Sequence, residues 1–200
     1  LISGSEAASL PDEAEARWRL VEEAWASRAG GDQPTVLYDA PHELLVTALT
    51  RGRRPITGIR PALNGYQKNV CFYCFGPIVL THGIGDEQSD VDHFLPHSLM
   101  ARLGLDLDRV WNLVLACRRC NRGEGGKLAG VPDQMYLSRL SRRNEYLIAS
   151  HHPLRETLIS TTGANRPERN RYLGAAHDAA CEIVGGRAGW KTPEEGPRRF

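Results

Sequence analysis

Three short motifs of this sequence are suited to metal binding or catalysis. They are two Cys-x-x-Cys pairs and an Asp-His dipeptide that lies between them. The pairs span residues 71–74 and 117–120, and the dipeptide is Asp92-His93. Zinc prefers four thiolate or imidazole ligands in a tetrahedron, and four thiolates leave no position open for water. The sequence therefore predicts a structural zinc site whose ligands are Cys71, Cys74, Cys117 and Cys120.

Other roles for these cysteines are less consistent with their context. A redox dithiol is the alternative for either pair alone, but neither pair lies in a thioredoxin-like βαβ pattern. Forty-two residues separate Cys74 from Cys117, so the intervening stretch must fold as a unit whose ends the metal holds together. The fifth cysteine, Cys181, falls in a predicted helix, and we interpret it as a small buried apolar residue.

The order of motifs resembles the HNH endonuclease family, also called ββα-metal nucleases. That family reads Asp-His-x-x-Pro-x-Ser, then Asn-Leu near a second strand, then Cys-x-x-Cys-Asn at the start of a helix. Here residues 91–98 read Val-Asp-His-Phe-Leu-Pro-His-Ser, residues 111–121 read Trp-Asn-Leu-Val-Leu-Ala-Cys-Arg-Arg-Cys-Asn, and Lys127 follows. The similarity covers about residues 69–130, and many family members also carry the flanking zinc site. The segment is also similar to the nuclease domain of that type in RNA-guided DNA-cutting enzymes.

The resemblance implies a role for each matching residue. His93 is the implied general base that takes a proton from the attacking water, and Asp92 and Asn121 are the implied ligands of a catalytic Mg²⁺ or Mn²⁺. Asn112 is implied to tether the loop between the two strands, which orients the strand that carries the histidine. Asn121 replaces the last histidine of the family name, a variant that the family accepts and that favours harder ions.

The chemistry of these side chains agrees with such roles. Imidazole has a pKa near 6.5, so it can accept a proton at neutral pH. A carboxylate and an amide oxygen leave most of the magnesium shell to water and phosphate, as that ion prefers. Neighbouring residues of a regular strand point to opposite faces, so Asp92 and His93 can face one phosphate only if the strand ends or bulges there. Pro96 favours such an end.

Charge is distributed unevenly along the chain. Residues 1–50 carry a net charge of −6 and residues 51–200 a net charge of +7, and the metal motifs lie in the basic part. A moderately basic body suits a polyanionic substrate, although a solvated surface would show the same composition. The cations nearest the motifs are the candidate nucleic-acid contacts, namely Arg118, Arg119, Arg122 and Lys127. The acidic residues 1–50 could dock a partner protein or subunit.

Periodicity predicts a mostly helical chain with a few short strands. Together with the resemblance it implies an α+β fold in which helices surround a ββα-metal core with a zinc-pinned double knuckle. We divide the chain into an acidic helical region at 1–55, the core at 56–131 and a helical region at 132–200. Helices are expected at 12–29, at 41–52, from 61, from 121, at 134–150, from 153 and at 167–184. Strands are expected at 78–80, 91–94 and 111–116, and the tail after 185 is expected to be irregular.

Composition narrows the class of protein. Hydrophobic residues make up 41% and charged residues 24% of the 200 residues, as in ordinary globular proteins. No apolar run approaches a membrane span and no signal peptide is evident, so a cytoplasmic location is expected.

The leading hypothesis is a Mg²⁺-dependent DNA endonuclease with a structural Zn²⁺, by analogy in bacterial restriction or anti-phage defence. The alternatives are a zinc-stabilised nucleic-acid-binding module that does not cut, a degenerate copy of the nuclease, and a structural zinc protein that joins a complex.

Overall fold

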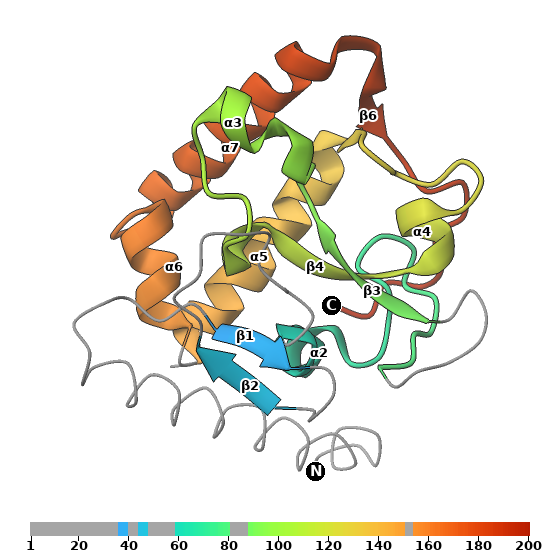
Figure 1. Ribbon diagram of the computed structural model, residues 1–200, viewed down its shortest axis with the longest axis horizontal. Helices are drawn as coiled ribbons and strands as arrows, with labels where there is room; N and C mark the ends of the chain where they lie inside the picture. The colour runs from blue at the N-terminus through green and yellow to red at the C-terminus, as the bar shows by residue number, and fades with distance from the viewer. Residues whose placement is uncertain (1–35, 40–43, 48–58, 81–87, 151–153) are drawn as a thin grey trace.

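The computed structural model describes residues 36–39, 44–47, 59–80, 88–150 and 154–200. Three small two-stranded sheets and several helices alternate along this part of the chain (Figure 1). The strands are β1 (Val36–Asp39), β2 (Leu44–Thr47), β3 (Ser89–His93), β4 (Leu113–Cys117), β5 (Val131–Pro132) and β6 (Ala188–Trp190). The α-helices are α2 (Arg60–Gln67), α3 (Met100–Leu103), α4 (Arg118–Arg122), α5 (Gln134–Ala149), α6 (Arg155–Thr162) and α7 (Arg166–Val184). Short 3-10 turns are η2 (His97–Leu99), η3 (Val110–Asn112) and η4 (Gly185–Arg187).

The centre of the fold is the antiparallel pair β3–β4, which leads directly into α4. Ser89 pairs with Cys117 and His93 pairs with Leu113, so the hairpin ends at His93. All five residues of β4 are buried, because elements cover both of its faces. On its open edge the Gln67 side chain exchanges two hydrogen bonds with the backbone of Leu115, at 2.8 and 2.9 Å, where a third strand would otherwise pair.

The three helices after residue 132 pack together, with α5 in contact with both α6 and α7, and α5 passes behind β4 in the view of Figure 1. Side chains at the helix starts supply hydrogen-bond acceptors: Asp133 accepts from Met135 N, and Asn165 accepts from Glu168 N. Such caps satisfy backbone donors that have no partner inside the helix. Buried residues of these helices join those of the hairpin in a single hydrophobic core.

The C-terminal residues return to the first cysteine pair. Strand β6 pairs in parallel with β5, and the chain then passes over the segment 71–75, where Gly196 N donates to Cys74 O at 2.8 Å. The Phe200 ring contacts the rings of Tyr66 and Phe75 at centroid distances of 5.0 and 4.9 Å. The tail therefore forms part of the packing around the cysteines.

Arg139 of α5 links the tail to the first cysteine pair. Its guanidinium is almost fully buried, donates to the carbonyls of Phe72 and Tyr73, and pairs with Glu195. Arg139→Met is expected to lower the free energy of unfolding by about 2 kcal/mol or more, because charged hydrogen bonds to two buried carbonyls are lost. Chemical denaturation measures this loss. Arg142→Met, on the exposed side of the same helix, should change stability by less than about 0.5 kcal/mol, and equal effects of the two variants would contradict the assignment.

The α+β class and the ββα core are confirmed, as are helices near 61, 134, 153 and 167 and the strand near 91. The strand predicted at 111–116 begins at Leu113 instead, because residues 110–112 form a 3-10 turn. The helix predicted at 41–52 is wrong where the structure describes it, since Leu44–Thr47 is a strand. Residues 78–80 make only an isolated bridge, from Val79 to Gln88, and the tail contains β6. Helix α4 begins at Arg118, before Asn121. The helix predicted at 12–29 lies outside the described residues.

The division of the chain at residues 55/56 and 131/132 stays a proposal. None of the described helices is long and apolar enough to cross a membrane.

Candidate metal centres and active site

The four cysteines come together as predicted. Their sulfur atoms all lie within 4.8 Å of one another, and the Sγ atoms of Cys74 and Cys117 are 3.8 Å apart. Two sulfurs bound to one tetrahedral zinc at 2.3 Å each are about 3.8 Å apart, so the spacing fits that ion. Within the described residues this is the one group of three or more His, Cys, Asp or Glu side chains arranged to share a metal.

Local structure positions these sulfurs and favours a bound cation. Cys117 is the N-terminal cap of α4 and accepts from Cys120 N, while Cys74 accepts from Gly76 N. Burial raises the pKa of the Cys71 thiol well above its ordinary range, and the neighbouring sulfurs raise it further. Like charges repel, so a shared cation such as Zn²⁺ would stabilise four neighbouring buried thiolates.

Asp92 and His93 both line one open pocket of about 210 Å³. Strand β3 ends at His93, so the two neighbouring side chains reach the same space although strand alternation would separate them. The pocket wall also includes Pro96, His97, Ser98 and Lys127. This volume is several times the roughly 30 Å³ that a water molecule occupies, so the pocket can admit a phosphate group.

The Asp92 carboxylate is 6% exposed and has two partners. The Tyr73 hydroxyl donates to it at 2.7 Å, and the Lys127 ammonium lies 3.2 Å from its other oxygen. Burial raises the pKa of the Asp92 carboxyl, whereas Lys127 and Tyr73 oppose that rise. As a hard oxygen donor on the pocket wall, Asp92 fits a magnesium ion, which would share the carboxylate with the lysine.

Lys127 reaches Asp92 because the chain turns tightly after α4. A Cβ on Gly126 would lie 2.8 Å from the carbonyl oxygens of Arg119 and Gly123, so only glycine fits this turn. The backbone amide of Lys127 then donates to Cys120 O at 2.7 Å, and its ammonium donates to His93 O at 2.9 Å. The ammonium is thus an internal partner of the site, and a phosphate can approach it only through the pocket.

His93 has a carboxylate partner of its own. Its Nε2 lies 2.7 Å from Asp108 Oδ1. Burial lowers the pKa of the His93 imidazole, and the Asp108 carboxylate partly offsets this. A lowered pKa keeps the ring neutral, and hence able to accept a proton, at neutral pH.

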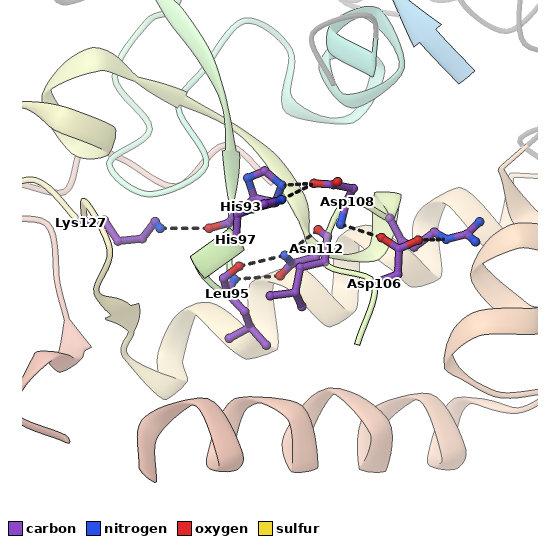
Figure 2. A network of polar contacts seen from close by, with 9 residues as sticks. His93, Leu95, His97, Asp106, Asp108, Asn112 and Lys127 are labelled. Carbon is purple, nitrogen blue, oxygen red and sulfur yellow. Dashed lines mark hydrogen bonds and ion pairs between the residues drawn. The ribbon is translucent and has the colours of Figure 1, made fainter. Parts of the chain in front are cut away.

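Asn112 lies just before β4 and is fully buried. Its side chain accepts from Leu95 N at 2.8 Å and donates to Leu95 O at 3.0 Å and to Leu107 O at 2.9 Å (Figure 2). The amide therefore connects the segment after His93 to the loop that precedes η3. The resemblance implies a tether at this position, and that role of Asn112 stays a prediction.

Asn121 does not line the pocket. Its Nδ2 donates to Asp90 Oδ2 at 3.0 Å, and Arg122 lies 3.0 Å from the same oxygen. Asp90 and Asp92 are two apart on β3 and so share the face that α4 covers. Asn121 is therefore on the same side of the hairpin as Asp92, and its role as a metal ligand stays a prediction.

The predicted nucleic-acid contacts fall into different surroundings. Arg118 is exposed, Arg119 pairs with Glu194 at 2.9 Å, and Arg122 pairs with Asp90. Lys127 is 3% exposed. Exposed ion pairs exchange readily with a competing anion, so the three arginines stay candidates for phosphate contacts.

Sequence reasoning missed Tyr73, Asp90 and Asp108. The sequence could have indicated Asp90, because side-chain alternation along residues 90–92 of a strand places both aspartates on one face. Residue spacing could not have indicated Tyr73 or Asp108, since each reaches the site from a loop.

A short antiparallel strand pair, a following helix and a four-cysteine cluster define the class, namely a ββα-metal core whose cysteines could share a metal ion. The model of the HNH endonuclease family matches residues 71–127, which run from the first cysteine to Lys127. Comparison with curated proteins and with solved structures gave no match. The family match confirms the resemblance over this segment and supports a nuclease type of function with a zinc site.

Proposed function

We propose that the protein is a Mg²⁺- or Mn²⁺-dependent endonuclease that hydrolyses phosphodiester bonds in DNA. The observation that carries this proposal is the convergence of Asp92 and His93 on one pocket, with the imidazole bonded to a second carboxylate. A zinc-stabilised binding module needs no such pair of groups at the end of a strand.

The side chains would divide the work as follows. His93 takes a proton from a water molecule in the pocket, whose oxygen forms a bond to phosphorus while the bond to the leaving 3′ oxygen breaks. Asp92 and Asn121 would hold the divalent ion, which stabilises the charge on the phosphate and on the leaving oxygen when bound. Lys127 balances the Asp92 charge from inside the protein.

The test is cleavage of supercoiled plasmid by the purified protein with Mg²⁺ or Mn²⁺. Wild type is expected to nick or linearise the plasmid, and EDTA is expected to stop the reaction. His93→Ala should lower the rate by about 10²- to 10⁴-fold, because general-base catalysis typically contributes that much.

The cleavage rates of His93→Ala and wild type can be compared only if the variant is as fully folded as wild type. His93 is partly exposed and outside the zinc cluster, so zinc content and the thermal unfolding temperature of the variant should match those of wild type. Equal cleavage by wild type and variant would show that His93 is not the base. Tight binding of DNA by wild type without cleavage would favour the binding module instead.

For the biological setting we propose bacterial restriction or anti-phage defence, with a partner protein or subunit docking on the acidic residues 1–50. Both proposals rest on sequence and analogy. A drop in phage plaque number on cells that express wild type, but not on cells that express His93→Ala, would support the first.

A further inference from the structure

The carboxylate of Asp108 lies beside the rings of His93 and His97, two histidines that line the pocket. Its Oδ1 lies 2.7 Å from His93 Nε2 and 3.7 Å from His97 Nε2 (Figure 2). Only the first distance is that of a hydrogen bond. The side chains of His93 and Asp108 are 13% and 12% exposed, whereas that of His97 is 39% exposed. Asp108 is therefore a specific partner of His93.

The loop that carries Asp108 is fixed from two directions. Asp108 N donates to Asp106 Oδ1 at 3.1 Å, and the other oxygen of Asp106 pairs with Arg109 at 2.8 Å. From the interior, Asn112 holds Leu107 O with the same amide group that holds Leu95. One buried side chain thus sets the spacing between the segment after His93 and the segment before Asp108.

We propose that Asp108 is a positioning residue that holds the His93 imidazole with its proton on Nε2, so that Nδ1 is the atom that accepts the proton of the attacking water. The inference rests on the proposed function and goes beyond it by naming the reacting atom and its orienting group.

The chemistry of the pair leads to this assignment. An ionised carboxylate can only accept a hydrogen bond, so Nε2 must donate, and a neutral imidazole carries one N–H. Nδ1 is then left with a free lone pair. When Nδ1 takes a proton from water, the ring becomes a cation that Asp108 stabilises, and the proton later leaves to solvent from Nδ1. A carboxylate that fixes the tautomer of a catalytic histidine in this way contributes strongly to the rate.

The first test observes the ring itself and needs no cleavage. In protein labelled with ¹⁵N at histidine, at a pH where the ring is neutral, His93 is expected to show a protonated Nε2 and an unprotonated Nδ1. Asp108→Asn is expected to give a mixture of both tautomers, because an amide can either donate or accept. A wild-type ring protonated at Nδ1, or a ring that the substitution leaves unchanged, would overturn the proposal.

The second test is kinetic. Asp108→Asn is expected to lower kcat about 10²-fold or more with little change in KM, and Asp108→Glu, which keeps the carboxylate, is expected to recover part of that loss. Asp178→Asn is a matched control, because Asp178 is 79% exposed and lies 3.8 Å from His177, away from the pocket. It should keep the wild-type rate. A kcat of Asp108→Asn within twofold of wild type, at equal zinc content and thermal stability, would overturn the proposal.

The two failures are distinguishable. Wild type that cuts no plasmid would sink the proposed function, and with it the catalytic part of this inference, while the ring spectra would still decide whether Asp108 fixes the tautomer. Wild type that cuts while Asp108→Asn cuts equally well would sink this inference alone.

Discussion

Cys74→Ser is expected to abolish stoichiometric zinc binding and to unfold the core. Binding of structural zinc contributes about 10–16 kcal/mol in small zinc domains, whereas a whole domain is stable by about 5–15 kcal/mol. Phe72 and Tyr73, between the first two cysteines, are fully buried against the rest of the core, so they lose their anchor when the ion is lost. Elemental analysis for zinc and circular dichroism during heating measure both effects.

Cys181→Ser is the matched control for this experiment. Cys181 is partly exposed on α7, and its sulfur lies 3.8 Å from His177 Nδ1, outside the four-cysteine cluster. This variant should keep one zinc per chain and a nearly unchanged unfolding temperature. A Cys74→Ser protein that keeps full zinc occupancy and a cooperative thermal transition would refute the structural zinc site.

Asn112→Ala is expected to lower stability by about 3 kcal/mol or more and to reduce cleavage in the protein that remains folded. The substitution leaves Leu95 N, Leu95 O and Leu107 O without partners in the interior, and each unsatisfied buried group costs about 1–3 kcal/mol. It also releases the two segments that bring His93 and Asp108 together. Urea denaturation and plasmid cleavage below the unfolding transition measure the two effects.

Asn144→Ala supplies the comparison for a buried asparagine. Asn144 is also nearly fully buried, but among the described residues its side chain makes one hydrogen bond, of 3.4 Å to Trp111 O, and its carbonyl oxygen has no partner there. Its removal should cost less than that of Asn112 and leave cleavage near the wild-type rate. The tether is disproved if the two variants lose equal stability and equal activity.

The core was predictable because its information is local. Each cysteine pair spans four residues, and the segment 111–121 encodes the second strand, the second pair and the helix start without interruption. Buried β4 is an apolar run, and α4 begins at the cysteine pair because Cys117 caps it. Local patterns of this kind determine both secondary structure and ligand spacing.

The strands that sequence reasoning missed depend on partners distant in the chain or on short apolar runs. Leu44–Thr47 contains two leucines, which fit a helix as well as a strand, and it becomes a strand by pairing with Val36–Asp39. Strand β6 is three residues long and pairs with β5, more than fifty residues earlier. Periodicity alone cannot tell whether a short apolar run forms a helix or a strand.

The charge pairing within the site could not be predicted from the sequence either. Lys127 was predicted to contact nucleic acid, a prediction that stays open, yet its ammonium is buried against Asp92. Likewise Asp108 lies fifteen residues from His93 in a loop with no motif of its own. Tertiary packing determines which charged side chains are buried, and residue spacing in the sequence does not show this.

The position of the tail has a consequence for biosynthesis. Glu195, Gly196 and Phe200 pack on the first cysteine pair and on Arg139, so the packing around residues 71–75 is incomplete until residue 200 is available. A growing polypeptide emerges from the ribosome with its N-terminal part first. The segment 71–75 therefore stays only partly supported while the 125 residues that follow it are translated.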